Sequence, residues 1–186
     1  MHNSKVVELD QSLFPILKTQ RLILRPLSES DANEIFTLRS DEKINRYVDR
    51  QQSKTLDEAL DFIKIISTKT QESNLKYWAI TIKGHDTLIG TICLFDESQD
   101  LKKCEIGFEL LNEFQGQGIM VEAANSVIEY GLQTLGFDAI KAHTHKENQK
   151  SIALLHKLNF NLTRLTLDSE PNLVVFLRTK NQEPTS

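Results

Sequence analysis

The feature that most constrains the fold is a run of three strand-like segments joined by short turns. The segments are Tyr77–Ile82, Thr87–Phe95 and Lys103–Leu111, and all three are rich in aliphatic and aromatic residues. Gly84-His85-Asp86 has the composition of a hairpin turn between the first two. The polar residues 96–100 indicate a second hairpin before the third. Consecutive strands on short connections predict antiparallel pairing within one sheet.

Helix and strand patterns alternate on both sides of this run. Arg21–Arg25 alternates as a strand that ends at Pro26, and Ser28 then begins a helix with Asp31 in a capping-box position. The other predicted elements are a helix at Leu56–Ile66 capped by Thr55, a helix at Ile119–Leu135 that stops near Gly136, a strand at Ala139–Thr144, a helix at Lys150–Leu158, and strands near Leu162–Leu167 and Leu173–Thr179. This order predicts an α/β (α+β) domain, a mixed sheet with helices packed on it.

Length and composition fit one domain and exclude several classes of protein. The 186 residues suit a domain at 16–180, between a flexible N-terminal arm at 1–15 and a tail at 181–186. A net charge of −4 argues against a nucleic-acid-binding protein, and no apolar run is long enough to span a membrane. Cys93 and Cys104 lie in apolar stretches, which indicates buried free thiols. Without a signal-peptide pattern, we expect a cytoplasmic protein.

A glycine-rich turn, Gln115-Gly116-Gln117-Gly118, lies between the third strand and the long helix. A helix start offers unpaired backbone N–H groups and a positive dipole end, which suit a phosphate, and glycine allows close approach. A plain strand-to-helix turn explains the same residues without a ligand. The turn is not a P-loop, because no Lys-Ser or Lys-Thr pair follows Gly118. It is not a dinucleotide fingerprint either, because Val121 stands where that motif requires glycine.

With these motifs, residues 105–160 resemble the GNAT acetyltransferases, most closely the ribosomal-protein N-acetyltransferase (RimJ/RimL-like) branch. The family signature is Arg/Gln-x-x-Gly-x-Gly/Ala, and Met120 stands where glycine or alanine is usual. The resemblance extends over about residues 18–180 and implies a GNAT-like, mostly antiparallel sheet with helices on both faces. It also implies acetyl-CoA as cosubstrate, no metal, and a cofactor pyrophosphate held by Gln115, Gly116, Gln117, Gly118, Ile119 and Met120.

The resemblance further implies that strand Lys103–Leu111 splays from its neighbour and pairs with the pantetheine arm of the acyl-CoA. Phe108, Glu109 and Leu110 would contact the cofactor through their backbone. Ordinary sheet pairing, with Phe108 and Leu110 on a core face, is the alternative, and the two are compatible. Met120 either packs between helix and sheet or crowds the cofactor.

Asn148 and Ser151 match the family's Asn-x-x-Ser at the start of the next helix. Both have a plain explanation as helix-capping residues. By resemblance, Asn148 could also touch the cofactor, and the Ser151 hydroxyl would lie near its sulfur and could protonate the departing thiolate. The helix ends in Lys157-Leu158-Asn159-Phe160, with Asn159 in place of the family's glycine. Asparagine is the next best residue for a left-handed position there.

Catalytic residues for amine acetylation are less evident. No Ser-His-Asp or Cys-His arrangement appears, which favours direct transfer over an acyl-enzyme. Glu105 and Glu109 share one face of their strand, and either could deprotonate the amine, Glu109 being nearer the splay. Two solvent-facing glutamates are the alternative. His143 and His145 also share a face, but no third metal ligand is evident near them.

Three functions remain open at this level. The leading one is acetylation of a protein or peptide N-terminal α-amine, which needs less help from a base than a lysine amine. The second is acetylation of a small amine such as a polyamine, amino sugar or drug, and the third is a non-catalytic acyl-CoA-binding or sensor module. A monomer or homodimer is expected from the resemblance, with no nucleic-acid or membrane partner.

Overall fold

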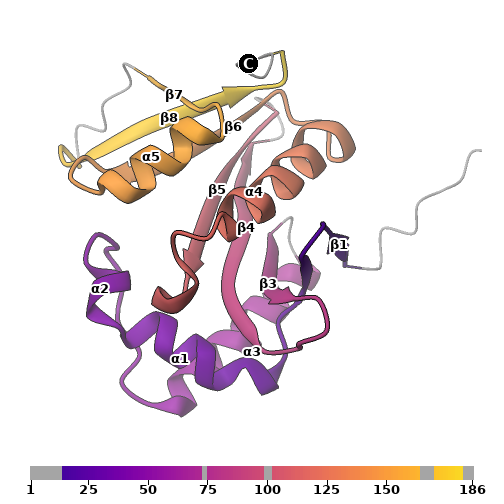
Figure 1. Cartoon of the computed structure of the whole chain (residues 1–186), viewed down its shortest axis with the longest axis vertical. Coiled ribbons are helices and arrows are strands. Elements are labelled where there is room, and N and C mark those ends of the chain that lie inside the picture. Colours follow the sequence, from indigo (N-terminus) through magenta and orange to yellow (C-terminus); the bar gives the residue numbers. More distant parts are fainter. Residues whose placement is uncertain (1–13, 73–74, 99–101, 164–169, 182–186) are drawn as a thin grey trace, which may run out of the picture.

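The computed structural model describes residues 14–72, 75–98, 102–163 and 170–181. The strands within these residues are β1 (Leu17–Lys18), β2 (Leu22–Pro26), β3 (Lys76–Ile82), β4 (Leu88–Ser98), β5 (Lys103–Leu110), β6 (Ala139–His145), β7 (Asn161–Leu162) and β8 (Leu173–Thr179). They form one sheet in the order β1-β2-β3-β4-β5-β6-β8-β7 (Figure 1). All neighbours are antiparallel except β5 and β6, which are parallel, so the predicted mixed, mostly antiparallel sheet is confirmed.

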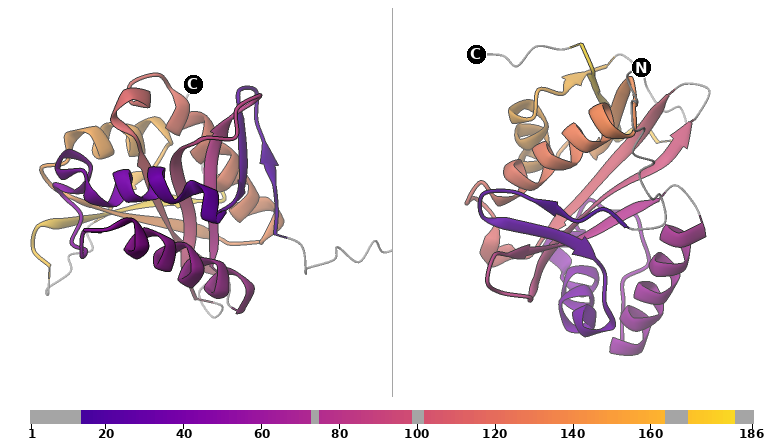
Figure 2. Two further views of the ribbon diagram at one scale, coloured as in Figure 1. Left: turned by 90° about the horizontal axis from the view of Figure 1, so that it is seen from below. Right: turned by 90° about the vertical axis from the view of Figure 1, so that its right-hand side faces the viewer.

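Helices cover both faces of this sheet (Figure 2). They are η1 (Glu29–Asp31), α1 (Ala32–Ser40), α2 (Glu42–Asn45), α3 (Leu56–Glu72), η2 (Asn112–Phe114), α4 (Ile119–Glu129), η3 (Tyr130–Thr134) and α5 (Gln149–Lys157). Helices α4 and α5 pack into one hydrophobic cluster, and α1 and α3 pack into a second. We call the face of the sheet covered by α1 and α3 the acceptor face, after the amine acceptor that the family resemblance leads us to expect there.

The two hydrophobic clusters follow from the alternation of side chains along the strands. Trp78 and Ile80 lie in the cluster of α4 and α5, whereas Ala79 lies in the cluster of α1 and α3. Trp78 is fully buried, its Nε1–H donates to the Pro15 carbonyl at 2.7 Å, and the Phe14 ring lies against it. The expected N-terminal arm therefore contacts the domain at its last two residues. Its remaining residues, 1–13, lie outside the described residues.

The first helices begin where the sequence predicts. Ser28 and Asp31 form a capping box at η1, and the Ser28 N–H donates to Asp31 Oδ2 at 2.8 Å. Arg25 holds the same carboxylate through two hydrogen bonds of 2.8 and 2.7 Å. At the start of α3, the Glu58 N–H donates to Thr55 Oγ1 at 3.3 Å. The sequence therefore sets these helix starts through short polar side chains.

Three features differ from the predicted elements. Helix α3 runs to Glu72 rather than Ile66, because the polar residues that end its apolar stripe still continue the helix. The two-residue strand β1 was not predicted. Helix α2 was not predicted either, since its four residues contain one apolar side chain, Ile44. Its cap is Asp41, which accepts from the Ile44 N–H at 2.9 Å.

The long helix after the glycine turn changes its hydrogen bonding before it ends. The predicted single helix Ile119–Leu135 is α-helical only to Glu129 and then makes one π-helical turn, η3. The Leu135 N–H accordingly donates to the Tyr130 carbonyl at 3.0 Å, five residues back. Gly131 lies in this turn, where a Cβ atom would approach Ile140 and Leu94 side chains at 3.2 Å. The missing side chain thus lets the turn lie close to the sheet.

The remaining strands and helices begin and end close to the predicted residues at most boundaries. Asn159 has φ of 59°, which confirms the left-handed residue expected after α5. Strand β4 extends to Ser98, beyond the predicted end at Phe95, and the ladder resumes at Ser98 after an irregularity. The strand predicted near Leu162–Leu167 is described only as β7, because residues 164–169 lie outside the described residues.

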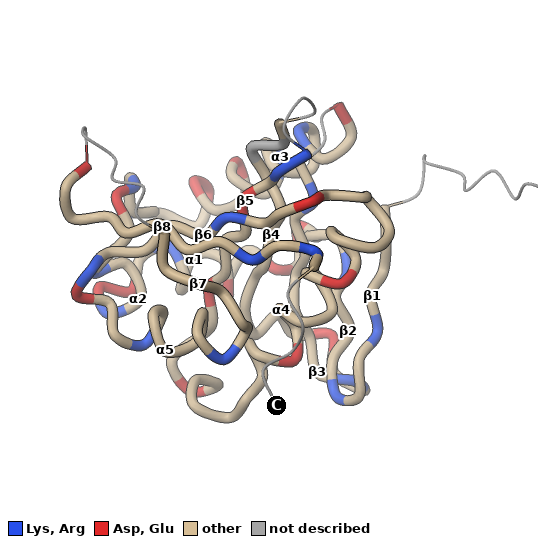
Figure 3. The backbone as a smooth tube through the Cα atoms, turned by 90° about the horizontal axis from the view of Figure 1, so that it is seen from above, with Lys and Arg blue, Asp and Glu red and all other residues tan. Residues whose placement is uncertain are grey.

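Charged residues of both signs are interspersed along the traced backbone (Figure 3). No segment of the tube in that view is uniformly basic, in keeping with a net charge of −4. Among the described residues, none of the helices combines the length and the apolar composition needed to span a membrane.

Candidate active site

The glycine turn adopts a conformation that only small residues favour. Gly116 has φ of 78° and Gly118 has φ of 74°, both in the left-handed region. Gly118 is the N-cap of α4, so the first N–H groups of that helix lack acceptors within it. A Cβ atom on Gly116 would meet no atom within 4 Å. The turn therefore leaves unpaired backbone N–H groups and open space beside the N-terminus of α4, which is the arrangement that suits a phosphate.

The two glutamines of the turn are held against the protein. The Gln115 side-chain amide donates to the Leu110 carbonyl at 3.0 Å, and the Gln117 amide donates to the Glu113 carbonyl at 2.8 Å. Both bonds return to the segment just before the turn. They fix the turn from within, and a ligand at the turn would meet mainly main-chain groups.

Two cationic side chains flank the turn from distant parts of the chain. Arg21, at the start of β2, donates from Nη1 to the Gln117 carbonyl at 3.2 Å, and its Nη2 is 3.6 Å from the ideal Cβ position of Gly118. Lys150, on α5, donates to Gln115 Oε1 at 3.2 Å. Sequence analysis missed both residues, since nothing in their local pattern links them to the turn. They add positive charge to a helix N-terminus.

Glu122 would oppose an anion at this helix start, but its charge is balanced. Its Oε2 accepts from Arg21 Nε at 2.6 Å, and its Oε1 accepts from the Arg21 backbone N–H at 2.7 Å and the Thr19 hydroxyl at 2.6 Å. Burial opposes ionisation, yet the bonds from Thr19 and Arg21 outweigh it and lower the pKa of Glu122. The carboxylate and Arg21 form one neutral unit that ties β2 to α4.

Met120 points into the protein rather than toward the turn. It is 7% exposed and belongs to the cluster of α4 and α5, next to Ile119. Of the two orientations expected from the sequence, packing between helix and sheet is the one observed. The residue that departs from the family signature therefore does not crowd the space beside Gly116.

Strands β5 and β6 separate after a short parallel ladder. The last pair in their register is Glu105 with Lys141, and from there to Leu110 β5 pairs with β4 alone among the described strands. Figure 1 shows the two ribbons diverging. One edge of β5 thus exposes backbone groups that could pair with an extended ligand. Phe108 and Leu110 face the α4 side as predicted, and Glu109 faces the acceptor side.

Asn148 and Ser151 meet at the start of α5. The Asn148 side chain accepts from the Ser151 N–H at 3.2 Å, which confirms that Asn148 caps the helix. Ser151 is half-buried, and its hydroxyl role stays a prediction. Because Lys150 bonds to Gln115, the start of α5 lies beside the glycine turn.

On the acceptor face, Glu109 is paired with an arginine. Arg50 donates to both carboxylate oxygens, at 2.7 and 2.6 Å, and each side chain is 17% exposed. Arg50 also donates to Asn45 Oδ1 and to the Leu38 carbonyl. Burial by itself lowers the pKa of Arg50, but the hydrogen bonds and charge of Glu109 outweigh burial and raise that pKa. For Glu109 to act as a general base, this bidentate pair would have to open.

Glu105 is paired with His143 across the point where β5 and β6 separate. His143 Nδ1 lies 2.8 Å from Glu105 Oε1, and both side chains are largely buried. His145, two residues on, stacks on Tyr47 with ring centroids 5.2 Å apart. No group of three or more potential metal ligands occurs among the residues the structure describes. The His143–Glu105 pair was not predicted. Its sign in the sequence is that the two residues lie on neighbouring strands, at positions that face the same side of the sheet.

A cavity of about 420 Å³ opens on the acceptor face between α1, α3 and the sheet. Its apolar wall includes Phe62, Ile66, Leu75, Tyr77 and Phe95. Its polar lining includes Arg39 and the Arg50–Glu109 pair. We call this cavity the acceptor pocket.

Cys93 also lines the acceptor pocket but is a poor nucleophile. Burial, and then the charge of Glu109, raise the pKa of its thiol to about 12. Burial likewise raises the pKa of Tyr77, whose hydroxyl donates to Thr91 Oγ1 at 3.1 Å. Cys93 and Cys104 are both free thiols, as predicted, but Cys104 alone of the two is fully buried, because Cys93 lies at the pocket wall. The neutral thiol gives no support to an acyl-enzyme at this position.

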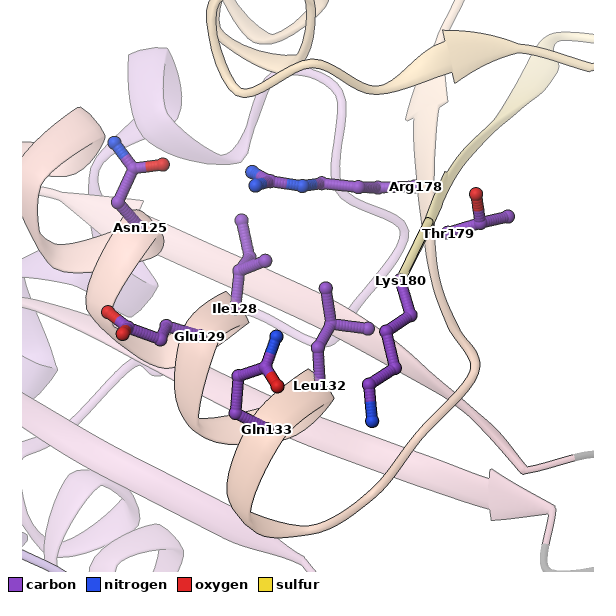
Figure 4. Close-up of a pocket in the computed structure, with 8 residues that line it drawn as sticks. All are labelled: Asn125, Ile128, Glu129, Leu132, Gln133, Arg178, Thr179 and Lys180. Carbon is purple, nitrogen blue, oxygen red and sulfur yellow. The ribbon is translucent and has the colours of Figure 1, made fainter. Parts of the chain in front are cut away.

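A second cavity, of about 270 Å³, lies on the other face between α4, η3 and the end of β8 (Figure 4). Arg178 reaches across it above Ile128, and the guanidinium donates to the Leu158 carbonyl at 2.7 Å. This bond satisfies a carbonyl at the end of α5. The cavity is lined by the later turns of α4, away from the glycine turn, and its lining contains no nucleophile–base pair.

Comparison with known proteins decides the family. The sequence matches the family described as Acetyltransferase (GNAT) domain over residues 21–161. The chain belongs to the GNAT acetyltransferase family. It is 33% identical over 148 residues to the uncharacterized N-acetyltransferase YoaA of Bacillus subtilis (strain 168), covering 80% of this chain and 84% of that protein.

The chain is also similar to an enzyme whose name gives its substrate and to a solved structure. Spermidine N(1)-acetyltransferase of Escherichia coli (strain K12) is 22% identical over 139 residues, covering 75% of this chain and 72% of that protein. RimL, a ribosomal L7/L12 alpha-N-protein acetyltransferase solved in complex with coenzyme A, superimposes with a TM-score of 0.76 at 19% identity. That alignment covers 89% of this chain and 98% of the RimL chain, and it concerns the fold. The GNAT enzyme described here is an acetyl-CoA-dependent N-acetyltransferase.

The geometry fits this cosubstrate. The open left-handed turn at the start of α4 suits a pyrophosphate, and the unpaired edge of β5 suits an extended amide-bearing arm. The acceptor pocket lies on the other face of the same strand, at Glu109.

Proposed function

We propose that this enzyme acetylates an α-amino group by direct transfer, with a peptide or protein N-terminus as its acceptor, as in the RimJ/RimL-like branch. The observation that carries the proposal is the His143–Glu105 pair on the acceptor face where β5 and β6 separate. An imidazole held by a carboxylate is a common general base near neutral pH. Glu109, the base favoured by the sequence, is instead engaged by Arg50.

The proposed cofactor contacts are those expected from the sequence. The backbone of Gln115, Gly116, Gln117, Gly118, Ile119 and Met120 holds the pyrophosphate. The backbone of Phe108, Glu109 and Leu110 holds the pantetheine and polarises the thioester carbonyl. Asn148 keeps the start of α5 in place beside the turn. Lys150 adds positive charge at the phosphates, and Arg21 offsets the negative charge of Glu122.

The proposed proton transfers use two groups of this chain. Acetyl-CoA supplies the acetyl group as a thioester. Glu105 accepts the Nδ1–H of His143, which leaves Nε2 to take a proton from the acceptor amine. The neutral amine nitrogen then forms the new bond to the acetyl carbon, the bond from that carbon to sulfur breaks, and the surplus proton on the nitrogen passes to the sulfur, which gives the amide and the free thiol. The Ser151 hydroxyl hydrogen-bonds the departing thiolate.

The acidity of the acceptor favours an α-amine over a lysine. An α-amino group has a reference pKa of about 7.7–8.0 and a lysine amine about 10.4, so at pH 7 roughly a tenth of the former is neutral and far less of the latter. A histidine base suits an α-amine, because an α-amine needs less help to lose its proton than a lysine amine does. Relatives named for a ribosomal protein N-terminus and for spermidine support the peptide and the polyamine alternatives respectively.

An amine panel tests the proposal. Acetyl-CoA is supplied with peptides that have a free N-terminus, with the same peptides N-terminally blocked but containing lysine, and with spermidine. Release of the thiol gives the rate, and mass spectrometry locates the acetyl group. We expect acetylation at the α-amine of the free peptides. Reaction of the blocked lysine peptides or spermidine alone would overturn the α-amine assignment.

A further inference from the structure

The acceptor pocket contains a cation that the fold leaves without an acidic partner. Arg39, on α1, lines the pocket together with Arg50 and Glu109. Arg50 already makes a bidentate pair with Glu109, so those two charges cancel. Among the residues the structure describes, no carboxylate lies within ion-pair distance of Arg39. The pocket therefore carries a surplus positive charge at Arg39.

Arg39 is held in position by neutral groups. Its Nε donates to Ser53 Oγ at 3.2 Å and its Nη2 to the Gln51 carbonyl at 3.5 Å. The guanidinium carbon lies 4.0 Å from the centroid of the Phe62 ring. Burial, and then repulsion from Arg50, lower the pKa of Arg39. An anionic ligand would relieve both costs, because it would supply the counter-charge that the fold does not.

The described lining of the pocket gives a cationic acceptor no free carboxylate to bind, because its one carboxylate, Glu109, is paired with Arg50. Tyr77 and Cys93 keep their protons at neutral pH, since burial raises the pKa of each group. The other walls are Lys69 and apolar side chains, including Phe62, Ile66 and Phe95. A second amine on the acceptor would meet the like charges of Arg39 and Lys69, and it would find Glu109 already paired.

We propose that Arg39 binds an acidic group of the acceptor, so that the preferred substrate is an α-amine that carries a carboxylate close by. This inference rests on the proposed function and names its substrate class. Two sources share that chemistry: a peptide N-terminus with aspartate or glutamate among its first residues, and a free acidic amino acid. A polyamine, which has only positive charges, is disfavoured by the same residue.

The test compares matched acceptors that differ by one charge. One arm uses two peptides identical except for aspartate or asparagine at the second position, and the other uses glutamate and glutamine as their α-amides, so that only the glutamate member carries a carboxylate. For wild type, kcat/KM should be at least about tenfold higher for the acidic member of a pair, the effect of a charge-assisted hydrogen bond in a half-buried site. Preference within the peptide pair alone, or the amino-acid pair alone, identifies the source.

Variants assign the preference to Arg39. Arg39→Gln should abolish it, with the KM for acetyl-CoA unchanged, whereas Arg39→Lys should keep a preference of more than about threefold. Lys64→Gln removes the same charge from an exposed position on α3 and should keep the full preference. Thermal unfolding checks that each variant is folded. If Arg39→Gln is unfolded, the wild-type preference must shrink by more than about threefold between low and high salt, as a charge contact requires.

The results separate this inference from the proposed function. Equal rates for acidic and neutral α-amines, or an undiminished preference in Arg39→Gln, would overturn the role of Arg39 and leave the α-amine assignment standing. An Arg39-dependent preference for acidic acceptors that are acetylated at some other amine would overturn the α-amine assignment and support the acidic pocket. Spermidine as the best acceptor would overturn both.

Discussion

The two sides of β5 present different kinds of groups to a ligand. On the α4 side, the glycine turn offers main-chain groups, and the side chains of Gln115 and Gln117 are fastened back to the preceding segment. On the acceptor side, the lining is made of side chains, charged, aromatic and aliphatic, from α1, α3, three strands and the adjoining loops. One side is a backbone site and the other is a side-chain site.

This difference determines which substitutions each side of β5 can tolerate. A backbone site depends on a few left-handed φ angles, so it tolerates little change and recognises one constant ligand. A side-chain site can change its charge by one substitution without altering the fold. The enzyme thus keeps its cosubstrate fixed and can alter its acceptor, and variants should affect one side or the other but not both.

The largest effect is expected at His143. His143→Gln should lower kcat about 100-fold or more at pH 7, because it removes the proposed base. The loss should shrink as pH rises and the α-amine loses its proton without help. The KM for acetyl-CoA should stay constant, which steady-state kinetics over a pH series would measure.

A histidine outside the site provides the control for this prediction. His85 is exposed in the hairpin between β3 and β4, and His85→Gln should be neutral. An unchanged kcat in His143→Gln would remove this residue from the mechanism. A parallel rise in the KM for acetyl-CoA would contradict the separation of the two sides.

A smaller effect, confined to the cofactor side, is expected at Gly118. Gly118→Val forces a β-branched residue into a left-handed position at a cost of about 1–2 kcal/mol and narrows the turn. The Kd for acetyl-CoA, measured by calorimetry, should rise at least about tenfold, with the acceptor preference retained. Gly84→Val is the matched control, since Gly84 has φ of 85° and open surroundings in a distant hairpin. It should lower the Tm similarly and leave the Kd unchanged; if both variants weaken binding equally, strain rather than the phosphate site is responsible.

Arg21 tests whether a side chain contributes to the backbone site. Arg21→Gln leaves Glu122 without its guanidinium partner at the helix start, so the Kd for acetyl-CoA should rise roughly three- to tenfold. The double variant with Glu122→Gln should recover most of that loss, because the uncompensated negative charge is then gone. Arg46→Gln, at an exposed residue, is the control for lost positive charge. A double variant weaker than Arg21→Gln would show that Arg21 acts by touching the ligand rather than by balancing Glu122.

The smallest effect is expected at Cys93. With its pKa raised to about 12, the thiol stays protonated through the working range, so Cys93→Ala should change kcat by less than about twofold. Iodoacetamide should label the folded protein slowly at pH 8. Detection of an acetyl group on Cys93 after incubation with acetyl-CoA alone would contradict direct transfer.

Sequence patterns predicted most of the sheet and the helix start at the glycine turn because both depend on local features. The alternation in β3, β4 and β5 fixes which side chains face α4, and the left-handed Asn159 follows from its place after a helix. Capping at Ser28, Thr55 and Asn148 is likewise a matter of residues three apart. Such features can be recognised from one sequence, because each depends on residues that are close together in the chain.

Side-chain pairs across the fold were beyond reach for a physical reason. The Arg50–Glu109 pair joins residues 59 apart in sequence, and the Arg21–Glu122 pair joins residues 101 apart. Their partners are chosen by packing of α1, α2 and α4 on the sheet, which no local periodicity encodes. The same holds for His143, which was considered for metal spacing with His145 and instead pairs with Glu105.

The short ladder between β5 and β6 has a consequence for the whole domain. Within the part of the chain that the structure describes, three register pairs join the strands β1–β5 to β6, β8 and β7, so the sheet is close to being two half-sheets that meet at Glu105 and Lys141. A cosubstrate that occupies the gap would act as a removable strand and lend its binding energy to the cohesion of the fold. Amide hydrogens of β6 and β8 would then exchange more slowly in the bound enzyme, and the resting protein would carry its weakest seam where the reaction takes place.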